Sequence, residues 1–304
     1  MQYGFSIKRK CYLLSVLLMT VWLTGCVQEE FESTPSPAGN GIRFTLTVPD
    51  VNLPSVSSRT MTGTGTAKKE DEIETVDILV FDMSKTPAVF LEWVSATGVT
   101  QDLADNSTVS FSAVLSPTTA STCIVVVANK ELDNIVSGFT KGATTKVEAM
   151  EKMLHTQTGK WLADGSTTGG YTRIPMYGEK VISKITPSMD PITGINMKRM
   201  LARIDIRNNS ATSNFTVEEV YLANYNTTGY IAPAWNTNGQ VTDPVPDTPV
   251  LPAGSGKKTE EGDAILYSVN GNTPYDGEIY TFESLAAEDA GGTGADGEAS
   301  RKDA

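Results

Sequence analysis

Residues able to do chemistry are scarce in this chain, which has one histidine and three cysteines among its 304 residues. A zinc site with two histidines cannot form, and a Ser–His–Asp triad would have to use the single imidazole, that of His155. The sequence contains no phosphate-binding glycine loop, no metal-ligand cluster and no cofactor fingerprint. It therefore predicts a protein that is not an enzyme, with no catalytic residues, no metal and no cofactor.

Basic residues are also few, since 24 lysines and arginines face 36 aspartates and glutamates and leave a net charge of −12. Binding to nucleic acid, which needs a basic patch, is not expected. The acidic residues are scattered, as on the solvated surface of an extracellular protein. A hydrolase with paired carboxylates could draw on Glu218 and Glu219 or on Asp102 and Asp105. Neighbours in a strand point to opposite faces, however, so the first pair cannot flank one bond.

Only one long apolar run stands out near the start of the chain, from Cys11 to Leu23, directly after the basic residues 8–10. The run is too short for a comfortable membrane span and long enough for the core of a signal peptide. It ends in Leu23-Thr-Gly-Cys26, which resembles a bacterial lipobox, where the cysteine thiol carries a diacylglycerol. We expect residues 1–25 to be a lipoprotein signal peptide and Cys26 to be lipidated. The alternative is an uncleaved anchor with a chance cysteine.

Residues 26–40 have the composition of a lipid-anchored linker. Val27–Glu30 is acidic and resembles the surface-export signal of Bacteroidota lipoproteins, and Ser33–Pro37 should be extended. The chain that follows is long enough for two domains of ordinary size. After loss of the signal peptide and lipidation of Cys26, Cys123 would be the one free thiol. Its apolar neighbours predict a buried, inert residue.

Two strand-like runs, Gly41–Val48 and Ile73–Phe81, organise the rest of the chain. In the first run, apolar side chains alternate with polar ones, which is the period of a half-buried strand. These apolar residues are Ile42, Phe44, Leu46 and Val48. The second run is apolar on most of both faces, with Asp77 expected near an end or an edge. The polar segment 50–71 between the runs should be open to proteases, so the first strand is either permanent or removable.

One helix is predicted, beginning at Thr145, because Thr145 and Glu148 have the spacing of a capping box. Val147, Met150 and other apolar residues then fall on one helix face. We expect His155 in the last turn, where a cation would suit the helix dipole.

Most of the remaining pattern is that of strands. We expect a turn at Ile174–Glu179, followed by a short strand at 181–185. Asn196–Ile206 should form a half-buried strand that pairs with Phe215–Ala223 across a polar turn. The run at Ile124–Val127 should be a central strand covered on both faces. Further strands are expected at 90–94, 108–115, 265–269 and 278–282.

The last stretch, Glu283–Ala304, is rich in glycine, alanine and acidic residues, with Leu285 as its only large apolar residue. It has the composition of a loop that leads to a missing strand. We expect the chain to be truncated inside its second domain. A natural disordered tail is the alternative.

A resemblance to a known family rests on the order and spacing of several motifs. They are the lipobox Leu23–Cys26, the first strand with Ser58-Arg59-Thr60, then Ile73–Asp82, Val125–Lys130, Ile174–Glu179, Lys198–Asp205 and Tyr280–Glu283. In this order the chain resembles the fimbrillin family of Bacteroidales, the FimA-like fimbrial subunits, from Cys26 to about Phe282.

The resemblance implies a mainly β protein with two transthyretin-like β-sandwich domains, the second incomplete, and one short helix in the first. The domains would cover residues 41–193 and 194–304, the latter with a disordered end. It also implies a lipoprotein precursor carried to the outer membrane and the cell surface. There a trypsin-like maturation protease would cut between Arg59 and Thr60, which removes the lipid on Cys26 together with the first strand.

The opened slot would then take a strand from another fimbrial subunit. The plug residues before the cut would be Ile42, Phe44, Leu46 and Val48, whose burial is worth roughly 6–12 kcal/mol before ordering costs. Removing a strand exposes unpaired backbone groups and apolar surface, and an incoming strand satisfies both. Lys68 or Lys69 could be cut instead of Arg59, and the stalk, tip and anchor positions of a fimbria all stay open.

A second hypothesis is a surface lipoprotein that keeps its anchor and binds a glycan or a host protein as an adhesin. Aromatic residues in predicted loops would support it, namely Trp161, Tyr171, Tyr230 and Trp235. An aromatic side chain flanked by turns more often packs over the end of a sandwich than on a sugar. The two hypotheses differ in whether the first strand and its lipid are retained.

Overall fold

The computed structural model describes residues 42–47, 71–101, 108–157, 159–161, 172–206, 219–242, 250–253, 255, 264–268 and 275–284. All of them belong to the unit that runs from Asn40 to Ala304. Several residues singled out above lie outside the described residues: Cys26, Val48, Arg59, Thr60, Lys68, Lys69, Asp102, Asp105, Tyr171 and Glu218. No helix in the described part of the chain is long and apolar enough to cross a membrane.

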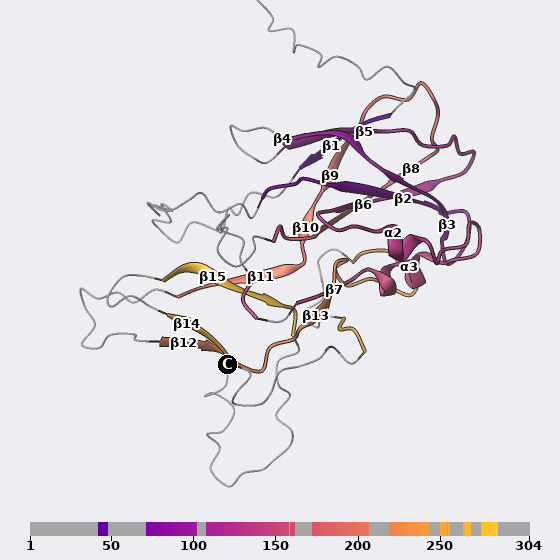
Figure 1. Cartoon of the computed structure of the whole chain (residues 1–304). Coiled ribbons are helices and arrows are strands. Elements are labelled where there is room, and N and C mark those ends of the chain that lie inside the picture. The colour runs from indigo at the N-terminus through magenta and orange to yellow at the C-terminus, as the bar shows by residue number, and fades with distance from the viewer. Residues whose placement is uncertain are drawn as a thin grey trace, which may run out of the picture. The chain divides into compact units, whose positions relative to one another are not determined.

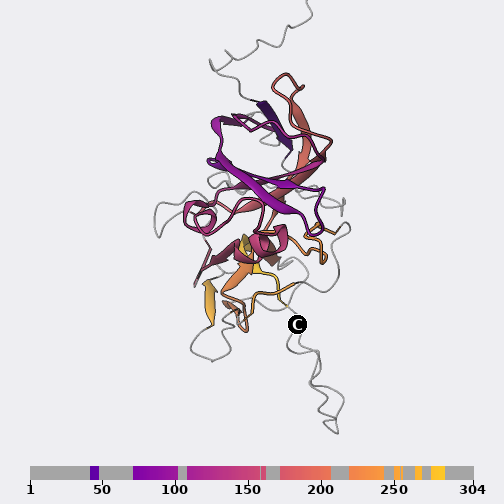
Figure 2. The same cartoon turned by 90° about the vertical axis from the view of Figure 1, so that its right-hand side faces the viewer.

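The protein is mainly β, as predicted, and two of its sheets form a sandwich (Figures 1 and 2). One sheet has the strand order β4-β5-β1-β9 and the other the order β10-β8-β6-β2-β3. The strands of the first are β1 (Ile42–Thr47), β4 (Thr97–Gln101), β5 (Thr108–Ala113) and β9 (Ile192–Asn196). Those of the second are β2 (Val76–Asp82), β3 (Val89–Ser95), β6 (Thr122–Ala128), β8 (Met176–Ile182) and β10 (Lys198–Arg199).

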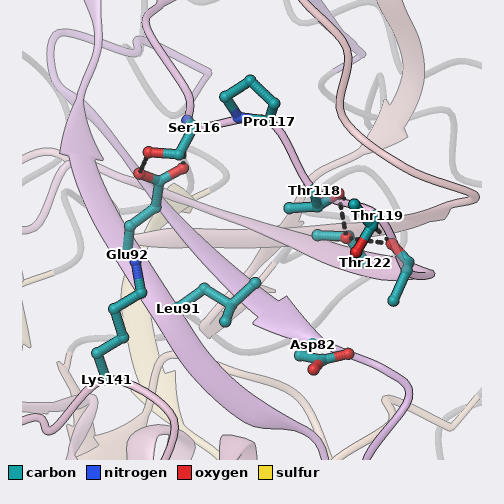
Figure 3. Close-up of a pocket in the computed structure, with 10 residues that line it drawn as sticks. Asp82, Leu91, Glu92, Ser116, Pro117, Thr118, Thr119, Thr122 and Lys141 are labelled. Carbon is teal, nitrogen blue, oxygen red and sulfur yellow. Dashed lines mark hydrogen bonds between the residues drawn. The ribbon is translucent and has the colours of Figure 1, made fainter.

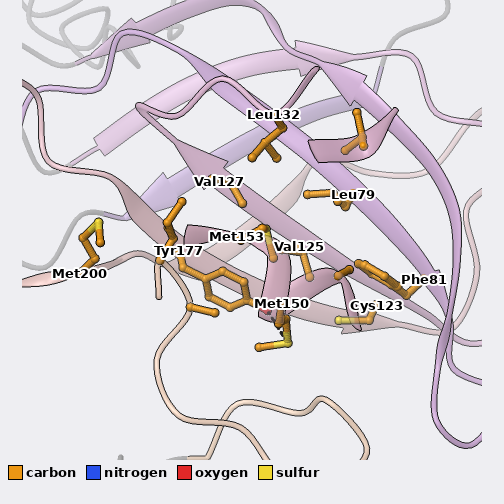
Figure 4. Close-up of a cluster of buried hydrophobic side chains, with 14 of the residues drawn as sticks. Leu79, Phe81, Cys123, Val125, Val127, Leu132, Met150, Met153, Tyr177 and Met200 are labelled. Atoms are coloured by element: carbon orange, nitrogen blue, oxygen red, sulfur yellow. Dashed lines mark hydrogen bonds between the residues drawn. The ribbon is translucent and has the colours of Figure 1, made fainter. Parts of the chain in front are cut away.

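The five-stranded sheet is apolar on both faces because each face covers a separate core. In β6, which lies between β2 and β8 and is buried throughout, alternate residues point to opposite faces. Ile124 and Val126 belong to the cluster between the two sheets. Val125 and Val127 belong to the cluster on the outer face, which Figure 4 shows. The predicted central strand is thus confirmed.

Asp77 is the second residue of β2, which confirms the expected place near a strand end. It does not lie at a sheet edge, because β2 has β6 and β3 on its two sides. Burial raises the pKa of this carboxyl group, while hydrogen bonds from Ser95 Oγ (2.7 Å) and Trp93 Nε1 (3.1 Å) oppose the rise.

Two helices cover part of the outer face of the five-stranded sheet, α2 (Asp133–Val136) and α3 (Lys146–Lys152). The predicted capping box of α3 is confirmed, since Thr145 and Glu148 each bind the other's backbone N–H. Helix α2 was not predicted, because its single turn has no side-chain cap. His155 was wrongly placed. Helix α3 ends at Lys152, and His155 lies in the strand β7 (Leu154–Thr156).

The turn predicted at Ile174–Glu179 is wrong, because β8 (Met176–Ile182) begins within it and continues past Glu179 without a break. Gly178, inside this segment, is a point of close approach between strands. A Cβ atom there would lie 2.7 Å from Met197 Sδ and 2.8 Å from Ile195 Cγ2. The glycine is therefore needed for packing against β9 rather than for chain reversal.

The later strands pair differently from the prediction. The expected strand Asn196–Ile206 is divided among β9, β10 and β11, and Ile204 is 39% exposed instead of buried. Strand β11 pairs with β15, while β12 pairs with β14 and β13 pairs with β7. The pairing of Asn196–Ile206 with Phe215–Ala223 is therefore wrong. The bounds are β11 (Leu201–Ile206), β12 (Glu219–Leu222), β13 (Thr228–Tyr230), β14 (Ile265–Ser268) and β15 (Tyr275–Phe282).

Candidate strand-exchange site

Strand β1 lies inside the four-stranded sheet, with a partner strand on each side. On one side it pairs with β5 in antiparallel register over its whole length, from Ile42 opposite Ala113 to Thr47 opposite Thr108. No residue of this ladder is skipped. The first strand is therefore fully integrated into the sheet, although its sequence neighbour along the chain, β2, belongs to the other sheet.

On its other side β1 pairs with β9, and this pairing is parallel. Phe44 lies opposite Ile192, while Leu46 lies opposite Ile195, so β9 has one extra residue between the two rows. Gly194, with a φ of +71°, supplies the left-handed conformation at this irregularity. Within the described residues, β9 has no other strand partner, and it forms the outer edge of the sheet.

The apolar side chains of β1 fill the centre of the core between the two sheets. Ile42, Phe44 and Leu46 are 5%, 1% and 0% exposed. The ring of Phe44 stacks on that of Phe111 in β5, with centroids 5.0 Å apart and planes at 7°. Burying three such side chains is worth roughly 4–9 kcal/mol. Removal of β1 would uncover this apolar surface together with the backbone groups of β5 and β9.

The polar face of β1 points away from this core, as its alternating sequence predicts. Arg43 is exposed and Thr45 half-buried. Both strand faces thus agree with the predicted half-buried strand. The described part of β1 holds three of the four predicted plug residues, and Val48 lies outside it.

The other core of the molecule contains a buried polar cluster around Glu179 of β8. Lys146, with a fully buried side chain, lies 2.6 Å from the Glu179 carboxylate, and the Tyr177 hydroxyl donates to the same carboxylate at 2.5 Å. The backbone N–H of Val241 donates to its second oxygen at 3.3 Å. Burial, and next the negative Glu179, raise the pKa of Tyr177 well above its ordinary value. The cluster therefore ties α3, β8 and residue 241 together as a structural element.

Cys123 and His155, the reactive residue types of the body, are both held in inert states. Burial raises the pKa of the Cys123 thiol to about 12, so the thiolate is suppressed, as the sequence predicts. Burial, and next the nearby positive Lys130, lower the pKa of His155 to about 4. Its ring packs 5.0 Å from that of Trp161 and 6.4 Å from that of Phe282. Both residues have the environment of packing residues.

The aromatic residues considered for sugar binding are largely occupied. Trp161 is buried and donates through Nε1 to the Thr172 carbonyl oxygen at 3.0 Å. Tyr230 and Trp235 are half-buried and pack edge to face on each other with centroids 4.9 Å apart. These contacts agree with packing over the end of a sandwich.

A pocket of about 240 Å³ lies at one end of the five-stranded sheet (Figure 3). Its polar groups bind one another: Glu92 accepts from both the backbone N–H and the hydroxyl of Ser116, at 2.7 and 2.6 Å. Thr118 and Thr122 share a hydrogen bond of 2.9 Å. No aromatic side chain lines the pocket. In the described part of the chain, no group of three or more His, Cys, Asp or Glu side chains could hold a metal ion either.

Comparison with known proteins bears on the role of the buried first strand. The sequence profile of the major fimbrial subunit protein FimA matches residues 42–245, about two thirds of the chain, and begins at the first residue of β1. This chain belongs to the FimA family. The fimbrillin resemblance of its motifs is thereby confirmed, and a fimbrial or adhesin role at the cell surface follows for the chain. None of the curated proteins matches it.

Several solved structures are similar to the chain at low identity. A fimbrial assembly protein from Parabacteroides distasonis is 12% identical, with 81% of this chain and 78% of that chain covered and a TM-score of 0.40. A candidate cell adhesion protein from the same species is 19% identical, with coverages of 83% and 73% and a TM-score of 0.41. A candidate polysaccharide-binding protein from Bacteroides thetaiotaomicron is 11% identical, with coverages of 81% and 73% and a TM-score of 0.36.

One of the two strands that flank β1 was not predicted from the sequence. Strand β5, with Val109 and Phe111, was predicted from its alternation. Strand β9 was not predicted, because Gly194 interrupts its apolar pattern. Ile192 and Ile195 are three residues apart, a spacing that fits a strand only when one extra residue is bulged out.

Proposed function

We propose that this chain is the precursor of a fimbrial subunit that loses β1 by proteolysis and then accepts a strand from another subunit. The observation that carries the proposal is the place of β1, in the interior of a sheet and with its apolar side chains in the core. When such a strand departs, it leaves a slot of defined shape, which favours an incoming strand with a similar pattern of apolar side chains. Family membership supports a subunit that assembles with other fimbrial subunits.

The proposal includes export as a lipoprotein to the outer membrane, with the lipid on Cys26. A protease with trypsin-like specificity then cuts between Arg59 and Thr60, in the polar segment that joins β1 to β2. The cut releases lipid anchor and β1 in one piece, because both lie on the N-terminal side of Arg59. Anchor release and slot opening are therefore one event. The division of the body at residue 193 into two sandwich domains is part of the same proposal.

The incoming strand has to replace what β1 supplied. It needs apolar side chains at every second position, to fill the spaces of Ile42, Phe44 and Leu46, and free N–H and C=O groups on both edges. The hydrophobic part alone is worth roughly 4–9 kcal/mol. A strand without this alternation would form the backbone hydrogen bonds to β5 and β9, but it would not fill the apolar core.

Replacing the cut site tests the proposal on the cell surface. In a strain that carries the full-length gene, Arg59→Ala, if necessary with Lys68→Ala and Lys69→Ala, should abolish the ladder of detergent-resistant oligomers. Arg43→Ala is the matched control and should leave the ladder of oligomers unchanged. This exposed arginine lies within β1, whose backbone is paired on both sides, so a protease cannot cut after it. A ladder that persists without the three basic residues would refute the proposed maturation.

The tethered adhesin would behave differently in the same experiment. It keeps β1 and the lipid, so its membrane attachment and its oligomeric state would not change when Arg59 is replaced. An anchor subunit of a fimbria would also keep the lipid. Retention of the lipid in wild-type cells would therefore favour either of these over a stalk subunit.

A further inference from the structure

We infer that, once β1 has left, β9 moves sideways within the sheet and pairs directly with β5. This closure removes the empty slot, so an incoming strand has to separate β9 from β5 again. The inference rests on the proposed function for the departure of β1. It concerns the state between that departure and assembly, when the core between the two sheets has lost a central strand.

Strand direction permits this closure. Strand β1 is antiparallel to β5 and parallel to β9. It follows that β9 is antiparallel to β5. The two strands can therefore form an antiparallel ladder with each other, the more stable kind of pairing. The movement required is one strand spacing, about 4.8 Å, within the plane of the sheet.

The register of the three strands also permits closure. In the present structure Val109, Leu46 and Ile195 form one row across the sheet, and Thr108, Thr47 and Asn196 form the next. A straight lateral shift of β9 would place Ile195 opposite Val109 and Asn196 opposite Thr108. These two pairs are consecutive in an antiparallel ladder. Apolar side chains would meet apolar side chains on the inner face, so no slip along the strand is needed.

The bulge at Gly194 gives a second, independent indication. It now interrupts a parallel pair, β1 with β9, where bulges are rare. After closure the same extra residue would lie between the row of Ile192 with Phe111 and the row of Ile195 with Val109. Bulges of this kind belong to antiparallel pairs, and a glycine with positive φ is one of their common forms. The backbone of β9 is thus already shaped for the closed pair.

The driving force is the pairing of exposed strand edges. Without β1, the facing edges of β5 and β9 carry unpaired N–H and C=O groups next to an apolar core. Apart from β1, β9 is held by the Lys180 ammonium group, which donates to the Thr193 carbonyl oxygen, and by the packing of Ile195 against Gly178. Met197 joins it to β10, which pairs with β8, so closure has to bend the chain at Met197. A lysine side chain can follow a shift of this size. Closure leaves the volume of Phe44 and Leu46 unfilled, so a full incoming strand still binds more favourably.

A disulfide across the closed pair tests the inference. The experiment uses the full chain with Cys11 and Cys26 changed to serine, a specific protease site in place of Arg59, and Thr108→Cys with Asn196→Cys. With β1 in place, these Cα atoms are two strand spacings apart, roughly 10 Å, which is beyond disulfide reach. Closure would bring them side by side. The control pair, Ser112→Cys with Asn196→Cys, is four residues out of register, about 13 Å along the strand.

After the cut, release of the β1 piece is checked by intact mass, and free thiols are counted under mild oxidation. Closure predicts loss of both engineered thiols in the in-register pair alone, and only once β1 has left. The oxidised protein should not take up a synthetic peptide of residues 41–48 until it is reduced. Free thiols together with immediate peptide uptake would overturn closure and leave the proposed function intact. A β1 piece that stays bound after the cut and never exchanges with the peptide would refute both.

Discussion

Phe44→Ala is the substitution that should loosen β1 most, because its ring is 1% exposed and stacks on Phe111 at 5.0 Å. Truncating a buried phenylalanine costs about 3–5 kcal/mol. Strand β1 is attached to the rest of the body through its two ladders and its three buried side chains. We therefore expect most of this loss to appear as local detachment of β1 rather than as general unfolding.

Amide hydrogen exchange of the uncut chain measures this detachment directly. Each 1.4 kcal/mol corresponds to a factor of ten, so the amides of β1 should exchange roughly a hundredfold to a few thousandfold faster in Phe44→Ala. The amides of β9 should accelerate as well, because β1 is its partner strand. Those of β6, in the centre of the other sheet, should change far less.

Arg43→Ala provides the matched control on the same strand, since its side chain is exposed. It should change stability by no more than about 0.5 kcal/mol. Equal acceleration of β1 and β6 in Phe44→Ala would show that β1 opens only when the whole body unfolds. Such a result would refute the idea that β1 is a separable element.

Three further substitutions test the other core. Lys146→Met leaves the partly buried Glu179 without its cation and should lower the free energy of unfolding, measured in urea, by about 3 kcal/mol. Adding Glu179→Leu should restore part of this loss, and no loss in Lys146→Met would contradict a stabilising ion pair. The pKa of His155 is about 4 in the folded protein against an ordinary 6.5, so its contribution to stability is complete above pH 6.5 and is lost as the pH falls towards 4. His155→Gln should remove that part of the pH dependence, and an NMR titration of the imidazole near pH 6.5 would refute the assignment. Cys123, with its pKa of about 12, should resist alkylation at pH 8 until the protein is unfolded, in a chain whose other cysteines are replaced.

Local sequence patterns identified the strands that have one clear periodicity. The alternation of Ile42, Phe44 and Leu46 predicts a half-buried strand, and the β-branched run around Val125 predicts a doubly covered one. Both are confirmed because each side chain's environment depends on strand geometry alone. The capping box of Thr145 and Glu148 fixed the start of α3 for the same local reason.

Patterns whose meaning depends on distant residues were misinterpreted. Gly178 is of a residue type common in turns. It lies within a strand, however, where its lack of a side chain leaves room for those of Met197 and Ile195. The partner of β11 is β15, whose paired residues lie 69 to 81 positions further along the chain, and alternation within one strand does not specify such a partner. Helix α3 ends at Lys152, because the ψ of 77° at its C-cap, Met153, leaves the helical region, although neither glycine nor proline marks the place.

The N-terminus of the mature protein on the cell surface, determined by mass spectrometry with the full-length gene, tests the central claim most directly. A chain that begins at Thr60 and runs as detergent-resistant oligomers is the predicted result, because both β1 and the lipid anchor would then be gone. A chain that begins at lipidated Cys26, with no cut form and no such oligomers, would contradict removal of β1 and the stalk-subunit role that depends on it.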